Sequence, residues 1–298
     1  MTVPRPPTTV RLPLTVAVAL AMALVTALLA GCSDETIADA EPATTTTIQP
    51  TTTTVARPGP NETVFATAIV TEITAYRDLP ADAAATGTPM VDRAAFAPVS
   101  VGPRADVPIP SIDLGAGTRY ATDTGWVFVS PTSFGAPTTF VVTEDRGDWL
   151  RVQVPVRPNG SEAWIRAAEV SLSRIDTRIE VSIGERRLRA LRAGQVIVDT
   201  LVVVGAPKTP TPTGRFYITD QVAKPHPGAY GPFVLPVSAF SQAMDQFAEG
   251  APMIALHGTN HPELVGTSRS NGCIRLPNDM ITRLRNELPL GTPVDIRA

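Results

Sequence analysis

The sequence predicts a mainly β fold. Many short runs rich in Val, Ile, Thr and aromatic residues are separated by Gly, Pro and Asn, which is typical of strands joined by tight turns. One segment, Asp279–Leu288, spaces its apolar residues along one helix face and ends at Pro289. We therefore expect a β protein with one or two short helices, in which Asn278 is the N-cap of the main helix.

Residues 1–32 have the features of a lipoprotein signal peptide. Arg5 and Arg11 begin it, and Leu12–Ala30 is an uncharged run of mostly Ala, Leu and Val. Leu29-Ala30-Gly31-Cys32 resembles a bacterial lipobox, in which the cysteine becomes the lipidated first residue of the mature chain. An uncleaved signal anchor is the alternative. Either form would tether the chain to the outer side of the cytoplasmic membrane, an extracytoplasmic location.

Residues 33–62 are expected to form a disordered linker. They contain two Thr tetrads and several prolines but few apolar residues to bury. A fully stretched linker of this length reaches roughly 100 Å, enough to carry a catalytic domain into a polymer layer above the membrane. With Cys32 lipidated, Cys273 is the only free thiol, so the mature chain has no internal disulfide.

Residues 63–172 are expected to form an all-β module. Val64–Tyr76 alternates loosely, and four further strands are expected: Trp126–Val129, Thr139–Val142, Trp149–Val154 and Ala163–Ile165. Residues 80–118, rich in Pro, Ala and Gly, are expected to be a long insertion. Short strands with tight turns favour a small barrel, and the end of the module is similar to bacterial SH3-like modules. Its three tryptophans belong either to the core or to a binding face.

Residues 173–298 are long enough for one compact domain. An antiparallel meander is expected from Ile179 to Val204, with Gln195–Val204 as one long strand whose end is buried on both faces. Strands at Arg215–Thr219 and Pro293–Ile296 and the single helix complete the domain. Met253–Leu256 is expected to be a buried strand, which places His257 at a strand end.

His257 and Cys273 are the candidate catalytic residues. Asn271-Gly272 predicts a turn directly before the cysteine, which is not typical of a core position. If the fold brings the two side chains together, the imidazole is a base for the thiol and favours thiolate near neutral pH. Backbone N–H groups at the turn could hold a developing oxyanion. The alternative is an inert core cysteine.

The sequence His257-Gly258-Thr259, followed by Ser270-Asn271-Gly272-Cys273-Ile274-Arg275, resembles the signature of the L,D-transpeptidase family with its YkuD-type catalytic domain. The resemblance implies a β-sandwich domain and a reaction on peptidoglycan stem peptides. Cys273 would be the nucleophile and His257 the base. The Gly258 carbonyl would orient the imidazole, as the third member of a triad does.

The resemblance implies oxyanion or substrate-binding roles for six further residues: Gly272, Asn271, Ser270, Arg275, Thr259 and Tyr230. The N–H groups of Gly272 and Cys273 are the expected oxyanion donors. Arg275 binds a substrate carboxylate or forms a structural ion pair, and both readings stay open. Many family members have histidine where this chain has Asn271, which excludes a second imidazole there.

The expected function is formation of 3→3 peptidoglycan cross-links through a cysteine thioester. Two alternatives remain: an L,D-carboxypeptidase that uses the same residues with water, and a non-catalytic wall-binding lipoprotein. No cofactor is expected. His261 follows His257 by four positions, which on a helix would suggest metal ligation. Gly258, Asn260 and Pro262 disfavour a helix there, so no metal is expected. The net charge of −3 gives no reason to expect nucleic acid as a partner.

Overall fold

The computed structural model describes residues 59, 61–81, 83, 117–247 and 250–298, without the side chains of residues 119 and 225–227. The expected signal peptide with Cys32, nearly all of the expected linker and most of the expected insertion lie outside the described residues. Within the described ranges, no helix combines the length and apolar character that crossing a membrane requires.

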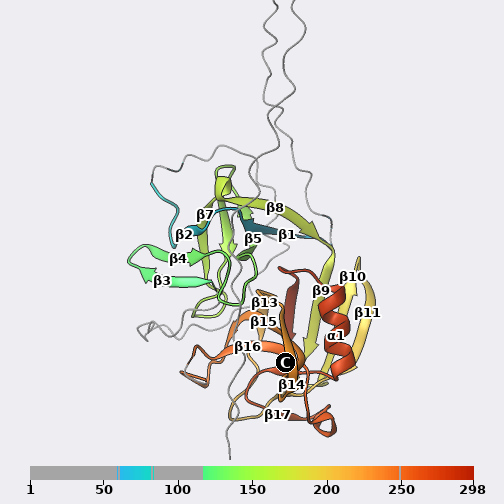
Figure 1. Ribbon diagram of the computed structural model, residues 1–298. Helices are drawn as coiled ribbons and strands as arrows, with labels where there is room; N and C mark the ends of the chain where they lie inside the picture. Colours follow the sequence, from blue (N-terminus) through green and yellow to red (C-terminus); the bar gives the residue numbers. More distant parts are fainter. Residues whose placement is uncertain (1–58, 60, 82, 84–116, 248–249) are drawn as a thin grey trace, which may run out of the picture. The chain divides into compact units, whose positions relative to one another are not determined.

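The first half of the described chain forms one eight-stranded sheet with the order β3-β4-β2-β7-β6-β5-β1-β8 (Figure 1). All of its pairings are antiparallel. Its strands are β1 (Thr63–Ala68), β2 (Glu72–Tyr76), β3 (Thr118–Thr122), β4 (Gly125–Val129), β5 (Thr139–Asp145), β6 (Trp149–Gln153), β7 (Glu162–Arg166) and β8 (Val170–Ile175). The expected all-β character of this half is therefore confirmed.

The expected β segment Val64–Tyr76 contains two strands, β1 and β2. The two pair with different neighbours: β1 lies between β5 and β8, and β2 lies between β4 and β7. The break falls at Ile69 and Val70, which are exposed. Alternation alone predicted extended chain but could not show where the chain changes partners. Strand β8 crosses the expected boundary at residue 172.

The three tryptophans belong to the interior of this sheet. Trp126, Trp149 and Trp164 are at most 6% exposed. An arginine guanidinium covers each ring: Arg77 lies over Trp126, Arg166 over Trp149 and Arg146 over Trp164, at 4.6, 4.6 and 5.0 Å from the ring centroids. The tryptophans thus supply buried area and cation–π contacts, rather than an open binding face.

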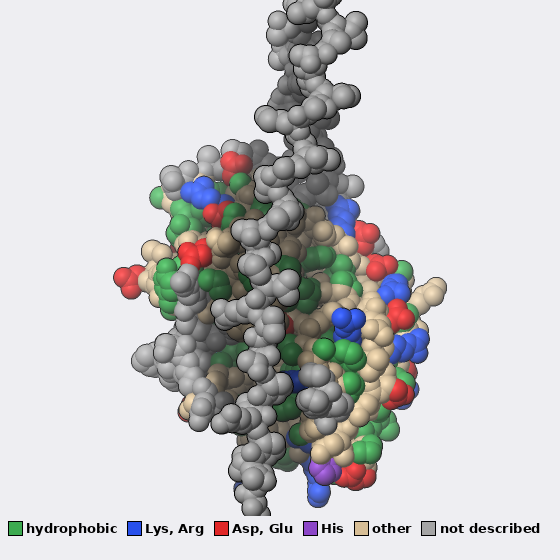
Figure 2. Space-filling model, in the orientation of Figure 1, with side chains coloured by type: hydrophobic (Ala, Val, Ile, Leu, Met, Phe, Trp, Pro, Cys, Tyr) green, Lys and Arg blue, Asp and Glu red, His purple; other side chains and the backbone are tan. Residues whose placement is uncertain are grey.

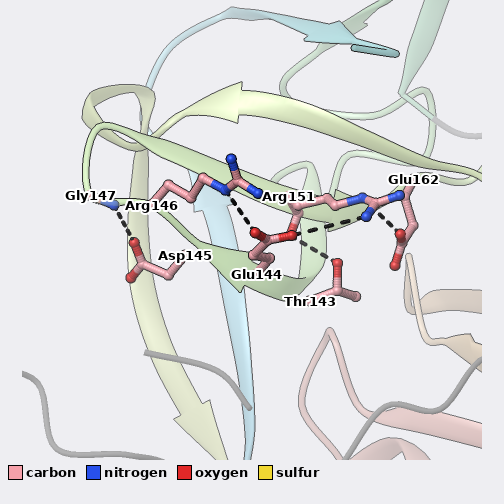
Figure 3. A network of polar contacts seen from close by, with 7 residues as sticks. All are labelled: Thr143, Glu144, Asp145, Arg146, Gly147, Arg151 and Glu162. Carbon is pink, nitrogen blue, oxygen red and sulfur yellow. Dashed lines mark hydrogen bonds and ion pairs between the residues drawn. The ribbon is translucent and has the colours of Figure 1, made fainter. Parts of the chain in front are cut away.

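A row of charges crosses the outer surface of β5, β6 and β7 (Figure 3). Glu144 lies between two arginines, with Arg146 Nε at 2.7 Å and Arg151 Nη1 at 4.0 Å. Arg151 Nε also contacts Glu162 at 2.9 Å. Like-charged residues are never direct neighbours in this row, so it favours the observed strand register.

The second half of the described chain contains the remaining strands and one α-helix, α1 (Asn278–Glu287) (Figure 1). A five-stranded sheet has the order β11-β10-β9-β19-β13, and a four-stranded sheet has the order β14-β15-β16-β18. The strands are β9 (Thr177–Ser182), β10 (Arg187–Arg192), β11 (Gln195–Leu201), β12 (Val204–Gly205), β13 (Gly214–Tyr217), β14 (Val222–Gly228), β15 (Gly231–Phe240), β16 (Met253–His257), β17 (Ser268–Ser270), β18 (Ile274–Arg275) and β19 (Pro293–Arg297).

One buried apolar cluster joins the two sheets and α1. It includes Ile179 and Val294 from the five-stranded sheet, Leu235 and Leu256 from the four-stranded sheet, and Leu284 from the helix. This arrangement agrees with the expected mainly β fold and meander. The helix starts one residue before the expected position, and Asn278 is not its N-cap. Pro277 occupies that place, and the Asn278 side chain bonds elsewhere.

The expected long strand Gln195–Val204 is also divided. Strand β11 ends at Leu201, whose side chain is 49% exposed, whereas Val202, Val203 and Val204 are fully buried. Val203 exchanges two backbone hydrogen bonds with Arg275, and β12 then pairs in parallel with β17. The buried valines therefore leave the sheet edge to support the segment that carries Cys273.

Hydrogen bonds also connect the first and second halves of the described chain. The buried Tyr217 hydroxyl donates to the Gln153 carbonyl at 3.1 Å, and Gln153 Nε2 donates to the Arg215 carbonyl at 2.6 Å. The Thr132 hydroxyl donates to the fully buried carboxylate of Asp220. These bonds replace hydration that the buried polar groups lose.

Acidic and basic side chains alternate along one margin of the face in Figure 2. The five-stranded sheet and α1 contain ion pairs of this kind. Arg187 and Arg189 contact Asp199, and Arg192 contacts Glu287. This part of the surface therefore carries mixed charge rather than a field of one sign.

Candidate active site

The two halves of the motif lie on neighbouring strands. Strand β16 pairs in parallel with β18, with Leu256 opposite Ile274 and His257 opposite Arg275. His257 is the last residue of β16, as expected, and Cys273 directly precedes β18. The Leu276 N–H donates to the His257 carbonyl at 2.8 Å and extends the pairing. The fold thus brings the segment that carries Cys273 alongside the strand that ends in His257.

The His257 imidazole is buried, with 3% of the residue exposed. Its Nδ1 lies 2.6 Å from the carbonyl oxygen of Gly258. Because a carbonyl only accepts hydrogen bonds, this contact assigns the proton of the neutral ring to Nδ1 and leaves Nε2 as the acceptor. The Tyr230 ring lies 4.9 Å from the imidazole, centroid to centroid, at 59°, and Tyr230 itself is 40% exposed.

The environment of His257 keeps the ring neutral. Burial lowers its pKa to about 4, the Gly258 carbonyl partly opposes this shift, and the positive charge of Arg275 adds to it. At neutral pH, His257 is therefore able to accept a proton through Nε2.

A short hydrogen-bonded turn positions Cys273. The buried Ser270 hydroxyl accepts from the Gly272 N–H at 3.1 Å and donates to the Cys273 carbonyl at 2.6 Å. Gly272 has φ of +110°, a conformation that favours glycine. This geometry corrects one expectation, because the Gly272 N–H is already bonded to Ser270 and is not a free oxyanion donor.

The thiol of Cys273 is surrounded by packed atoms, although the residue is only half-buried. Burial raises its pKa, against the opposing effects of an Ala255 backbone hydrogen bond and the charge of Arg275. Its Sγ lies 4.0 Å from the Met253 carbonyl oxygen. Burial thus favours the neutral form of both the Cys273 thiol and the His257 imidazole.

Arg275 acts on both candidate catalytic groups, since its charge lowers the pKa of His257 and of Cys273. Its Nε is buried and has no hydrogen-bond partner among the described residues. The described chain gives Arg275 no ion pair with a carboxylate. Of the two expected roles, the unpaired Nε favours binding of a carboxylate over a structural ion pair.

Two threonines that the sequence did not single out bond to the turn that precedes Cys273. Thr211 Oγ1 donates to the Gly272 carbonyl at 2.8 Å and accepts from the Gly205 N–H at 2.8 Å. Thr209 Oγ1 donates to the Ser270 carbonyl at 3.1 Å. Both belong to the Thr-Pro-Thr-Pro-Thr-Gly loop at residues 209–214.

The remaining candidates are placed less centrally. Thr259 is buried, and its backbone N–H and Oγ1 bond to Asn278 and His261, so its polar groups form a turn. Asn271 is exposed beside Cys273. His261 pairs with Glu263 at 2.9 Å on the surface. The described residues include no group of three or more potential metal ligands.

Comparison with known proteins points to the same segment. The family model of the YkuD L,D-transpeptidase catalytic domain matches residues 176–296. YkuD of Bacillus licheniformis, which is named as an L,D-transpeptidase, is 34% identical over 122 residues, covering 41% of this chain and 66% of that protein. YqjB of Bacillus subtilis, named likewise, is 33% identical over 97 residues, or 31% of this chain and 55% of that protein.

The chain thus spans slightly less than two thirds of the first of these relatives and about half of the second. Among solved structures, the catalytic domain of an L,D-transpeptidase from E. faecium is 22% identical, with a TM-score of 0.33, covering 41% of this chain and 96% of that domain. The family model and the sequence relatives therefore support a YkuD-type L,D-transpeptidase catalytic domain at residues 176–296.

Proposed function

We propose that this chain is a peptidoglycan L,D-transpeptidase that forms 3→3 cross-links through a thioester on Cys273. The observation that carries the proposal is the parallel pairing of β16 with β18, which aligns the strand ending in His257 with the segment of Cys273 and places Arg275 beside both. A base, a thiol and a cation in one place meet the needs of acyl transfer from a peptide that carries a carboxylate.

In the first step, the Cys273 sulfur attacks the carbonyl carbon of the third stem residue while its proton moves to His257 Nε2. The neutral resting state suits this route, because His257 with a pKa of about 4 is unprotonated before attack. The carbon–nitrogen bond to the terminal D-amino acid then breaks, and the leaving amine takes the proton from His257. A thioester and a free D-amino acid result.

In the second step, an amine of another stem attacks the thioester. His257 accepts the amine proton, the carbon–sulfur bond breaks, and the sulfur regains a proton. The products are a new amide and the free enzyme, so no oxidant or cofactor is consumed. Transfer exceeds hydrolysis only if the site positions the amine and limits water. Tyr230, whose ring lies 4.9 Å from the imidazole, is the candidate for this shielding.

Stabilisation of the tetrahedral intermediate is assigned to the Cys273 N–H, with the exposed Asn271 side chain as a second donor. The Gly272 N–H is left out because it bonds to Ser270. Arg275 would hold the substrate carboxylate through its unpaired Nε. Arginine forms stronger and more directional bonds with carboxylate than a point charge does.

The test is a stem-peptide assay with the purified chain and a disaccharide tetrapeptide, read by mass spectrometry. Cross-linked dimers and a tripeptide acyl adduct on Cys273 are expected. Cys273→Ser should abolish both, while His257→Gln should slow acylation strongly because the thiol loses its base. Arg269→Gln, a change at an exposed arginine of β17, is the matched control and should keep wild-type activity.

The alternatives give different products. Tripeptide without dimers, when acceptor amine is in excess, would identify an L,D-carboxypeptidase instead. Absence of any product, with wall binding unchanged in Cys273→Ser, would favour a non-catalytic wall-binding protein.

We also propose that residues 1–32 direct export, that Cys32 carries lipid, that residues 33–62 act as a linker, and that residues 63–172 form an SH3-like module before the domain at 173–298. These proposals rest on the sequence features of the leader, the linker and the β segment. Cys32→Ala should release the protein from the membrane fraction of a bacterial host. Retention of this variant on membranes would contradict lipid anchoring through Cys32.

A further inference from the structure

The peptide unit between Gly258 and Thr259 is bonded at both ends. Its carbonyl oxygen lies 2.6 Å from His257 Nδ1, and its N–H, which belongs to Thr259, donates to Asn278 Oδ1 at 2.9 Å. One peptide plane therefore connects the imidazole to a side chain on α1. Rotation of this plane would turn the carbonyl away from Nδ1 and break both bonds together.

Asn278 is placed to fix that plane. A Cβ atom built on either Gly231 or Gly258 would collide with Asn278 Oδ1, so the amide oxygen lies between the two glycines. Gly231 directly follows Tyr230, whose ring contacts the imidazole at a tilt of 59°. The oxygen of Asn278 thus packs against the two segments that contact His257, although the residue as a whole is exposed.

The hydrogen bond from the Thr259 N–H to Asn278 Oδ1 also extends the pairing of β16 with β18 beyond its last backbone hydrogen bond. Ile274 pairs with Leu256, and the Leu276 N–H donates to the His257 carbonyl. The next contact along the two segments is made by the Asn278 side chain. Asn278 does not bond to its own helix as an N-cap. Its oxygen is therefore used for the histidine segment rather than for the start of α1.

We infer that Asn278 is a positioning residue, which locks the 258–259 peptide so that the Gly258 carbonyl holds the His257 imidazole with Nε2 free. Hydrogen bonding at the N–H end polarises the amide and strengthens its carbonyl as an acceptor. Outer partners of this kind orient a histidine ring and fix its tautomer. The catalytic meaning of the inference rests on the proposed transpeptidase function, whereas the effect on the ring does not.

The test compares Asn278→Ala, Asn278→Asp and Asn286→Ala in the full chain. Asn286 lies on the same helix, is exposed and has no contact with the site, so it is the matched control. Nitrogen-15 NMR of the His257 ring reports tautomer and protonation without any need for turnover. Asn278→Ala should give a mixture of tautomers, while the control should keep the Nδ1–H form.

Asn278→Asp retains an oxygen acceptor and adds negative charge. It should keep the Nδ1–H tautomer and raise the pKa of His257 by roughly one unit. In the stem-peptide assay, Asn278→Ala should lower kcat by about tenfold with little change in KM, and Asn278→Asp should restore most of the loss.

An unchanged tautomer in Asn278→Ala would overturn the inference. If Asn278→Ala does not fold, Asn278→Asp provides the test. An unchanged pKa of His257 in Asn278→Asp would also overturn the inference. If the wild-type chain makes no cross-links while the ring still responds to position 278, the proposed function fails and the positioning role stands.

Discussion

Thr211 Oγ1 donates a hydrogen bond to the carbonyl oxygen of Gly272 at 2.8 Å, across 61 residues of sequence. The same hydroxyl accepts from the Gly205 N–H. A single buried side chain thus connects the chain leaving the five-stranded sheet to the turn that presents Cys273.

Thr211→Val should loosen that turn. Valine has nearly the same shape, but it leaves the Gly272 carbonyl and the Gly205 N–H without their partner. The free energy of unfolding should fall by about 1–3 kcal/mol, and amide hydrogen exchange at Gly272 and Cys273 should quicken. Denaturant unfolding and exchange mass spectrometry provide the measurements. Thr200→Val, on edge strand β11, changes only a local bond and should have little effect.

Gly272→Ala should destabilise the protein for two reasons. Its φ is +110°, and the added methyl would lie 3.0 Å from Ile254 Cδ1 in the core. Gly135→Ala is the matched control, because Gly135 has φ of +90° but nothing within 4 Å of an added methyl. The loss of unfolding free energy should exceed that of the control by about 1 kcal/mol or more. Equal losses would show that Ile254 moves aside without cost.

Arg275→Gln should raise the pKa of His257 above its value of about 4. The positive charge of Arg275 disfavours the imidazolium, and the substitution removes that charge. The same change should raise the pKa of Cys273, since the thiolate loses an opposite charge. NMR titration of the ring and the pH dependence of iodoacetamide labelling measure the two shifts. Arg275→Lys keeps the charge and should retain most of the effect. An unchanged pKa of His257 in Arg275→Gln would disprove that the charge of Arg275 lowers this pKa.

Asp220 should make stability depend on pH. Burial raises the pKa of its carboxyl to about 6, despite hydrogen bonds from Thr132 and Thr219, whereas the unfolded chain titrates near 3.9. The folded state binds the proton more tightly, so this contribution is fully present below about pH 4 and is lost as pH rises through 6.

Asp220→Asn removes that dependence. At pH 8, the variant should exceed the wild type in unfolding free energy by about 1–3 kcal/mol, and the two should converge near pH 4. Denaturant midpoints between pH 4 and 8 measure the difference. Asp123→Asn, at an exposed turn, is the control. Parallel curves for Asp220→Asn and wild type would refute the prediction.

The sequence predicted local structure well where one pattern dominated. The strand ending at His257 and the helix near residues 279–288 both appear within one residue of expectation. Prediction from the sequence failed where the chain passes from one neighbouring strand to another. Val202 and its neighbours looked like the end of a strand, because burial on both faces gives the same apolar run whether the chain stays in a sheet or passes beneath a loop.

The candidate site was predictable as a set of residues but not as a set of bonds. Cys273, His257 and Arg275 stand out by their chemistry and by the turn before the cysteine. The Ser270 bond that occupies the Gly272 N–H, and the Asn278 bond to Thr259, depend on tertiary placement. Asn278 is a typical helix N-cap by composition, and only a competing partner 19 residues away explains why it is not one.

The protonated resting form of the Cys273 sulfur also bears on chemical durability. Peroxide and disulfides react with thiolates, and thiols that keep their proton react slowly with both. Under the proposed mechanism, in which the thiol ionises only as a substrate carbonyl arrives, resting Cys273 would therefore resist oxidation.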